Sequence, residues 1–411
     1  SPGGAAAVEW ARQAMLDLGL ENVRLEPVQA VHWERGDVGR VALVEPAEFA
    51  GEELPMLALG GSVATPEHGL VAEVVVVDSL DACAQLGTAA QGKIVLFNGP
   101  FDAGLAHTFT GYGRAVGQRS RGASTAASVG AVGALVRSMT PNLDDVPHTG
   151  GMRYAGDQPK IPTAAISTNA AARIASLVAA GKTVTVHFQQ NPQSFPDAPT
   201  FNVVGELVGR EKPEQIVVVG GHLDAWDVGQ GAHDDGAGCV HALEAARLLS
   251  AFGPPRRTLR VVLFANEENG LRGGTTYVST HAGAMEQHLL ALESDSGGFT
   301  PRGFETNASA EGNPGARAVL QTVAGMLAFA GAGEISDGGG GADIGPMRQH
   351  GVVTVGYEPD SQRYFDLHHT HEDTLDKVSA RELHLGAGCI AALLRVVTEM
   401  ELDLPRNPVG G

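Results

Sequence analysis

A run of charged residues follows directly after an apolar stretch in the second half of the chain. Residues 220–239 read GGHLDAWDVGQGAHDDGAGC, and they come immediately after the apolar run QIVVV. The stretch holds two histidines and four aspartates among six glycines. Charges at the end of a buried strand cost free energy unless something pairs with them. Any fold of this chain must therefore provide such a partner here.

The second half of the chain alternates apolar strands with amphipathic helices. Strands are predicted from the runs FNVVGELVG, QIVVVGGH, LRVVLFANEE and HLLALESDSGG, and helices from VHALEAARLLSAF, ARAVLQTVAGMLAFA and LHLGAGCIAALLRVVTEM. This alternation is typical of an α/β fold in which helices cover both faces of a mixed sheet. The sequence therefore predicts such a sheet for the second half.

The first half has a different organisation. Residues 5–18 predict an amphipathic helix with apolar positions at helical spacing. From about residue 50 the pattern changes to short strands bounded by Gly and Pro, and the Pro-rich stretch NPQSFPDAPT is interpreted as a closing linker. We therefore expect a main domain made of residues 1–49 and 196–411, with an inserted, β-rich domain at 50–195.

Length, charge and cysteine content limit which partners and which cellular location are expected for this chain. A length of 411 residues favours more than one hydrophobic core. The formal net charge of −19 argues against nucleic acid and anionic membranes as partners. The sequence contains no run of 18 apolar residues, so no membrane span is predicted. The chain begins without Met, which fits either a removed export signal or a trimmed chain, and a secreted or periplasmic location is expected. The cysteines, Cys83, Cys239 and Cys389, lack metal-binding spacing and are expected to be buried thiols.

Five polar clusters follow the predicted strands. They are His222 with Asp224, Asp234 with Asp235, Glu267 with Glu268, Glu293 with Asp295, and the run HHTHEDT from His368 to Thr374. Sites in α/β folds gather at the carboxyl ends of strands. A cation is the simplest partner for converging carboxylates, and imidazole with carboxylate suits zinc, with Co²⁺ or Mn²⁺ as alternatives.

Each cluster taken alone has an ordinary structural interpretation. A single His-x-Asp is usually a surface pair, DDG is usually a turn, and two glutamates usually begin a solvated helix. Five clusters in equivalent positions after strands favour a shared metal site over five independent coincidences.

In this order the clusters resemble the dinuclear zinc aminopeptidase and glutamate carboxypeptidase superfamily. Further segments resemble its plasma glutamate carboxypeptidase group and that group's bacterial relatives, namely VRLEPV, HWERGD, GKIVLFN, PHTG, PKIPTA and ESDSG. The resemblance covers most of the chain. It implies a zinc exopeptidase fold and identifies the insert as similar to a protease-associated domain.

The resemblance also implies a ligand set for two Zn²⁺ ions per chain. His222 and Asp295 would hold one ion, and Glu268 and His369 would hold the other. Asp234 would bridge the two ions. In such a centre Glu267 would be the general base. Asp224 would hydrogen-bond the second ring nitrogen of His222.

Two positions of this ligand set have alternatives. His369 is preferred because the family places its ligand four residues before the acid of the Asp-Thr pair, with His371 as the second choice. His368 is expected to pack or to contact substrate. Asp235 is the alternative to Asp234 as the bridge. The resemblance implies a cis peptide bond between these two aspartates.

The implied activity is hydrolysis of small unblocked peptides, dipeptides foremost, by a metal-bridging water that Glu267 activates. The alternatives on the same scaffold are a broader aminopeptidase and a carboxypeptidase or deacylase. A metal-free binding protein is the least favoured interpretation, because the ligand set is complete. No GxSxG, GxGxxG or P-loop motif supports another chemistry. A homodimer is implied by the resemblance alone, and the glycine-rich residues 336–347 are expected to shape the substrate pocket.

Overall fold

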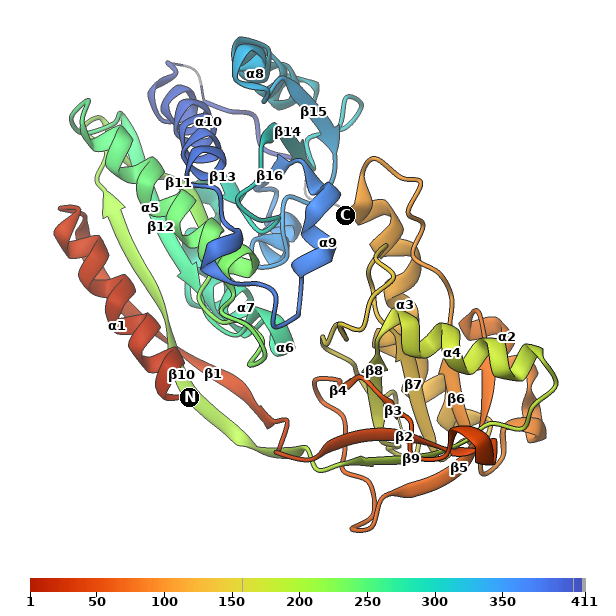
Figure 1. Ribbon diagram of the computed structural model, residues 1–411. Coiled ribbons are helices and arrows are strands. Elements are labelled where there is room, and N and C mark those ends of the chain that lie inside the picture. Colours follow the sequence, from red (N-terminus) through yellow and green to blue (C-terminus); the bar gives the residue numbers. More distant parts are fainter. Residues whose placement is uncertain (157, 402, 409–411) are drawn as a thin grey trace. The chain divides into compact units, whose positions relative to one another are not determined.

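The computed structural model describes residues 1–156, 158–401 and 403–408, and the chain divides into two compact units (Figure 1). The first unit holds Ser1–Val31, Asp197–Tyr364 and the residues from Asp373 onward. The second unit holds His32–Pro196 together with Phe365–Glu372. The second unit thus includes residues on both sides of the expected 50–195 boundaries, because β2 (Gly39–Glu45) pairs with β9 (Thr185–Gln190).

The described residues of the first unit build an eight-stranded mixed sheet in the order β1-β10-β12-β11-β13-β16-β14-β15. Neighbouring strands β12, β11, β13 and β16 are parallel, and β10 and β14 pair antiparallel on their flanks. The strands are β1 (Glu21–Glu34), β10 (Gln193–Leu207), β11 (Lys212–His222), β12 (Arg257–Phe264), β13 (His288–Glu293), β14 (Pro301–Thr306), β15 (Glu334–Asp337) and β16 (Val353–Pro359).

Both faces of this sheet are buried under helices. Val217 and Val219 of β11 belong to a core shared with α1 (Pro2–Asp17), α5 (Ala237–Ser250), α8 (Pro314–Met326) and α10 (Ala380–Glu399). Val218 points to the opposite face, into a core with α7 (Arg272–Thr280). Alternate residues of a strand face opposite sides, so a doubly covered strand reads as a continuous apolar run. The predicted α/β class and its helices are confirmed.

The parallel strands end at the same edge of the sheet. In the register, His222 is opposite Phe264 of β12, and Gly220 is opposite Glu293 of β13. Glu293 is in turn opposite Gly356 of β16. The polar residues that follow β11, β12 and β13 therefore start from one edge, as the sequence predicts.

The second unit also contains an eight-stranded mixed sheet, in the order β3-β2-β9-β5-β6-β7-β8-β4 among its described residues. Its faces carry two separate apolar cores. Its further elements are β3 (Glu53–Leu54), β4 (Met56–Ala58), β5 (Leu70–Val77), α2 (Leu80–Gln85), β6 (Ile94–Phe97), α3 (Thr108–Ser128), β7 (Gly133–Arg137), β8 (Thr163–Ile166) and α4 (Thr168–Ala179). The identity of this unit as a protease-associated domain stays a prediction.

The Pro-rich stretch at residues 191–200 is not an irregular linker. β10 begins at Gln193 and runs through it without interruption, passing from the second unit to the first. The register between β10 and β12 covers only Val203 to Leu207. Pro196 and Pro199 precede that part, where a missing N–H costs no hydrogen bond to β12. Proline is tolerated in this part of β10, and the sequence interpretation wrongly took these prolines as the sign of a linker.

Two expectations from composition can be checked directly. Cys83, Cys239 and Cys389 are free and buried, as predicted. Among the described residues, the helices are too short or too polar to cross a membrane.

Candidate metal centre

His222 ends β11 with its imidazole almost fully buried. Its Nδ1 lies 2.9 Å from the main-chain carbonyl oxygen of Asp224. A carbonyl oxygen can only accept, so Nδ1 carries a proton, and Nε2 is the ring nitrogen left to bind a metal. This tautomer, inferred from the hydrogen-bond partner, is the one a metal-binding histidine needs.

Three of the predicted ligands converge in the first unit. Nε2 of His222 lies 3.3 Å from Oδ1 of Asp234 and 3.4 Å from Oδ1 of Asp295. One donor atom from each of the three residues falls within 4.8 Å of the other two. Burial lowers the pKa of His222, but hydrogen bonds to Asp234 and Asp295 more than offset it and raise that pKa well above its usual value. A buried imidazole between two carboxylates is a donor set that fits zinc.

The turn that carries Asp234 is held by Asp373. The carboxylate of Asp373 accepts the N–H of His233 at 2.8 Å and the N–H of Asp234 at 3.1 Å. Asp373 is itself buried. Sequence reasoning used Asp373 only to count back to His369 and missed this role. The sequence did hold a hint of this role, because Asp373 follows HHTHE and had been given no partner.

Asp235 points away from the ligand cluster. Its Oδ2 accepts the N–H of His222 at 2.9 Å, and its Oδ1 accepts the N–H of Gly238 at 3.0 Å. A Cβ on Gly221 or Gly238 would overlap these carboxylate oxygens, so both positions need glycine. The peptide bond between Asp234 and Asp235 is cis, as predicted. The geometry favours Asp234 over Asp235 as the ligand.

Asp224 accepts a hydrogen bond from Nδ1 of His222, as predicted, but through its main-chain carbonyl oxygen and not through its carboxylate. Its carboxylate oxygen lies 3.9 Å from Nδ1 of His222, and the main-chain carbonyl takes that hydrogen bond instead. The carboxylate accepts the N–H of Glu267 at 3.0 Å and the N–H of Glu268 at 3.2 Å. The first N–H groups of a helix lack partners within it, so a carboxylate is drawn to them. Asp224 therefore holds the turn that bears the two glutamates.

Glu267 and Glu268 begin the short helix α6 (Glu267–Gly270), after Asn266 with a left-handed φ of 60°. Burial raises the pKa of Glu267 well above its usual value, and the carboxyls of Asp295, Glu268 and Asp343 raise it further, against an opposing effect of His222. The Glu267 side chain keeps some exposure to solvent. A partly accessible carboxyl with a raised pKa is suited to accept and return a proton.

Glu293, at the end of β13, and Asp343, in the glycine-rich segment, form a second pair of buried carboxyls. Glu293 accepts the N–H of Asp343 at 3.3 Å and the N–H of Ile344 at 3.0 Å. Burial, followed by the charge of Asp295, raises the pKa of Glu293 to about 8. Glu293 thereby ties the glycine-rich segment at 336–347 to the end of β13.

His369 belongs to the second unit. Its Nδ1 lies 3.2 Å from the carbonyl oxygen of Thr149 and donates to it, so Nε2 is again the nitrogen left to bind a metal. His368 is buried and stacks on His369 with ring centroids 3.5 Å apart. The side chain of His371 is 59% exposed and pairs with Glu372 at 3.3 Å. Burial and tautomer favour His369 over His371 as a ligand.

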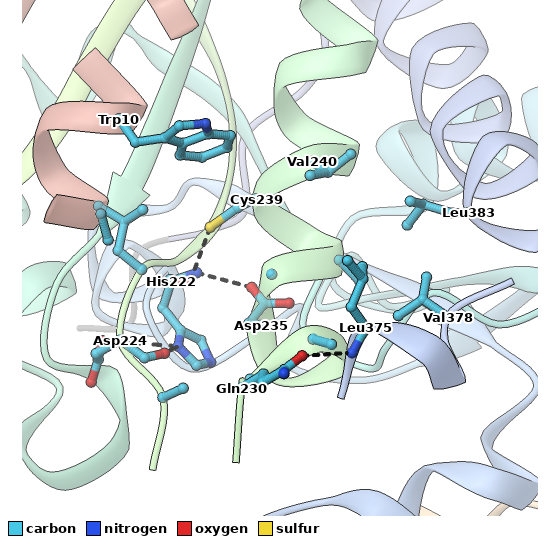
Figure 2. A pocket seen from close by; sticks show the side chains of 17 residues that line it. Trp10, His222, Asp224, Gln230, Asp235, Cys239, Val240, Leu375, Val378 and Leu383 are labelled. Atoms are coloured by element: carbon cyan, nitrogen blue, oxygen red, sulfur yellow. Dashed lines mark hydrogen bonds and ion pairs between the residues drawn. The ribbon is translucent and has the colours of Figure 1, made fainter. Parts of the chain in front are cut away.

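A cavity of about 330 Å³ adjoins His222 on its other side (Figure 2). Trp10 of α1, Val240 of α5 and Leu375 contribute to a mostly apolar lining. His222 and Asp235 line it too, whereas Asp234, Asp295 and Glu267 do not. Of the proposed ligands in the first unit, His222 alone is among the residues that line this cavity.

Comparisons with known proteins agree on one family. Residues 202–394 match the model of Peptidase family M28. Carboxypeptidase Q from Bos taurus is 39% identical over 402 residues, which cover 98% of this chain and 82% of that protein. A crystal structure of a peptidase M28 precursor from Shewanella amazonensis SB2B is 33% identical with a TM-score of 0.93, covering 99% of this chain and 91% of that one. A zinc aminopeptidase from Bacillus subtilis shares the fold at a TM-score of 0.68 and 19% identity, covering 98% of this chain and 91% of that one.

Proposed function

Because the chain belongs to peptidase family M28 and is a metallopeptidase, we propose that it is a zinc-dependent exopeptidase that hydrolyses small unblocked peptides, dipeptides foremost. The observation that carries the metal-dependent reaction is the convergence of His222, Asp234 and Asp295 on one point in the first unit. Two carboxylates and an imidazole that converge in this way are matched by a metal cation.

The proposed ligand set has two zinc ions. His222 and Asp295 would hold one ion, Glu268 and His369 would hold the other, and Asp234 would be shared between them. Supporting this set, both histidines donate Nδ1–H to a main-chain carbonyl and so present Nε2. Co²⁺ and Mn²⁺ are the alternative metals for such donors.

The residues of the first unit divide the work of hydrolysis. When bound, a metal pair of this kind polarises the scissile carbonyl and lowers the pKa of the attacking water. Glu267 takes a proton from that water and delivers it to the leaving amine. The carboxylate of Asp224 accepts the main-chain N–H of Glu267 and so fixes the position of that glutamate. Asp373 does the same for Asp234.

Three versions of one dipeptide test which end the enzyme recognises. The zinc-loaded protein is given the free dipeptide, its N-acetylated form and its C-amidated form. Cleavage of the free and amidated forms alone supports an aminopeptidase. Cleavage of the free and acetylated forms alone supports a deacylase or a carboxypeptidase, and the latter is the activity in the name of the relative from Bos taurus. Cleavage of only the free form supports a dipeptidase, and no cleavage would refute the proposal in favour of a binding protein.

A homodimer is part of the proposal on the ground of the resemblance. Light scattering coupled to gel filtration should give twice the chain mass of 42.5 kDa. A monomer at the concentration used in the assay would refute this part. Export to a secreted or periplasmic location stays a prediction.

A further inference from the structure

The segment that carries His369 is enclosed by aromatic side chains of the second unit. Phe365 is fully buried and lies in the segment just before the histidines. Its ring centroid is 4.9 Å from those of Phe109 and Tyr112, and 5.2 Å from that of Phe101. Aromatic contacts of this kind add stabilisation beyond the apolar area they bury. The segment is thus packed onto α3 and the loop before it.

The PHTG segment, Pro147–Gly150, runs alongside the histidines and bonds to them. The N–H of Thr149 donates to the carbonyl oxygen of His369 at 3.1 Å, and Nδ1 of His369 donates to the carbonyl oxygen of Thr149 at 3.2 Å. Nδ1 of His148 lies 2.8 Å from the carbonyl oxygen of His368, so it donates as well. Three hydrogen bonds therefore join two consecutive residues of each segment.

The PHTG segment is in turn held by the body of the second unit. The hydroxyl of Thr149 donates to the carbonyl oxygen of Ala58 at 3.0 Å. The N–H of His148 donates to the hydroxyl of Ser138 at 2.8 Å. The buried guanidinium of Arg119 donates to the carbonyl oxygen of Thr149 at 3.4 Å. Burial lowers the pKa of His148 to about 3, so its ring is uncharged near neutral pH.

His369 needs such support because of its backbone. Its φ is 62°, a left-handed conformation that residues with a side chain rarely adopt. Residues hold such conformations only where surrounding contacts determine them. The three hydrogen bonds from His148 and Thr149 supply these contacts.

We propose that His148 and Thr149 are positioning residues that set the tautomer and backbone of His369 for zinc. This inference rests on the proposed role of His369 as a zinc ligand. Thr149 fixes which ring nitrogen presents a lone pair, and His148 holds the preceding peptide. The second unit therefore sets the zinc affinity of His369, in addition to any part in substrate access.

His148→Leu and His148→Asn separate positioning from simple packing. Leu removes the hydrogen bond to the His368 carbonyl, whereas the amide of Asn restores a donor near the position of Nδ1. Zinc stoichiometry and the affinity of each zinc are measured by competition with a chromophoric chelator. We expect His148→Leu to lower the binding affinity of one of the two zinc ions by about 10–100-fold. His148→Asn should recover most of that lost affinity.

His187→Leu is the matched control. His187 lies on β9 of the same unit and also bonds a carbonyl through its ring, that of His68 at 2.9 Å. Its ring bond joins β9 to the turn before β5, so both zinc ions should bind this variant with wild-type affinity. Equal zinc affinities for His148→Leu and His187→Leu would overturn the inference.

His369→Ala distinguishes failure of this inference from failure of the proposed ligand set. If His369→Ala keeps both zincs, His369 is not a ligand and the ligand set is wrong. If it loses one zinc while His148→Leu keeps wild-type affinity, only the positioning role is wrong.

A second measurement does not depend on any variant of His148 folding. In ¹⁵N-histidine spectra of the zinc-free wild-type protein, we expect His369 as the Nδ1–H tautomer, with its signal assigned by its absence in His369→Ala. An Nε2–H tautomer would overturn the role of Thr149.

Discussion

Replacing Asp373 by Asn tests whether this carboxylate holds the turn that carries Asp234. Its two oxygens accept the N–H groups of His233 and Asp234 at 2.8 and 3.1 Å, and only 3% of Asp373 is exposed. Asn keeps the shape and one acceptor, but its NH₂ group then faces the other N–H. A buried N–H without an acceptor costs about 1–3 kcal/mol, and exchanging a charged acceptor for a neutral one weakens the remaining bond. We expect the free energy of unfolding of the first unit to fall by about 2–4 kcal/mol.

Urea unfolding of zinc-free protein, followed by tryptophan fluorescence, measures this loss without a contribution from metal binding. Asp376→Asn is the matched control, because its exposed carboxylate accepts only the nearby Thr374 hydroxyl among the described contacts. That control should change stability by less than about 0.5 kcal/mol. Zinc affinity should also fall in Asp373→Asn, since the orientation of Asp234 relaxes. Equal stability of the two variants would refute the reasoning.

Three further predictions address the chemistry and its pH dependence. Glu267→Gln should retain zinc by elemental analysis but lose about 10²–10⁴-fold in kcat, and wild-type turnover would contradict its role as the base. His369→Ala should cost far more activity and zinc than His371→Ala, and the reverse ranking would make His371 the ligand. Burial lowers the pKa of His241 from 6.5 to about 4, so the unfolded chain binds a proton that the native state lacks in that range. Its contribution to the unfolding free energy should therefore fall by about 3 kcal/mol as the pH drops from 6.5 to 4, and this slope should be absent in His241→Gln.

The position of the candidate site could be predicted from local sequence. Apolar runs such as QIVVV require burial on both faces, and helices between them require parallel strands. Parallel strands end at a common edge, so His222, Glu267 and Asp295 could be placed together without a structure. Their residue types then pointed to a cation, since a histidine among carboxylates has few other uses at a buried edge.

The direction of each side chain at that edge could not be predicted in the same way. Asp224 was expected to hydrogen-bond His222, and it does so through its main-chain carbonyl oxygen, while its carboxylate caps the unpaired N–H groups at the start of α6. The resemblance placed Asp234 ahead of Asp235 as the bridge, but the sequence did not show that Asp373, more than a hundred residues away, accepts the N–H groups of His233 and Asp234 and so holds this turn.

The sequence by itself therefore determined the fold class, the edge that carries the site and the kind of ligand it binds. The fold class and the edge follow from hydrophobic periodicity, which acts over a few residues. The kind of ligand follows from the residue types at that edge. Only the tertiary structure decided which oxygen or nitrogen each residue presents. The hydrogen bond from His369 to Thr149, two hundred residues apart in the chain, is the clearest case. In irregular backbone after a strand, side-chain direction is set by partners that folding brings together, and local pattern carries no record of them.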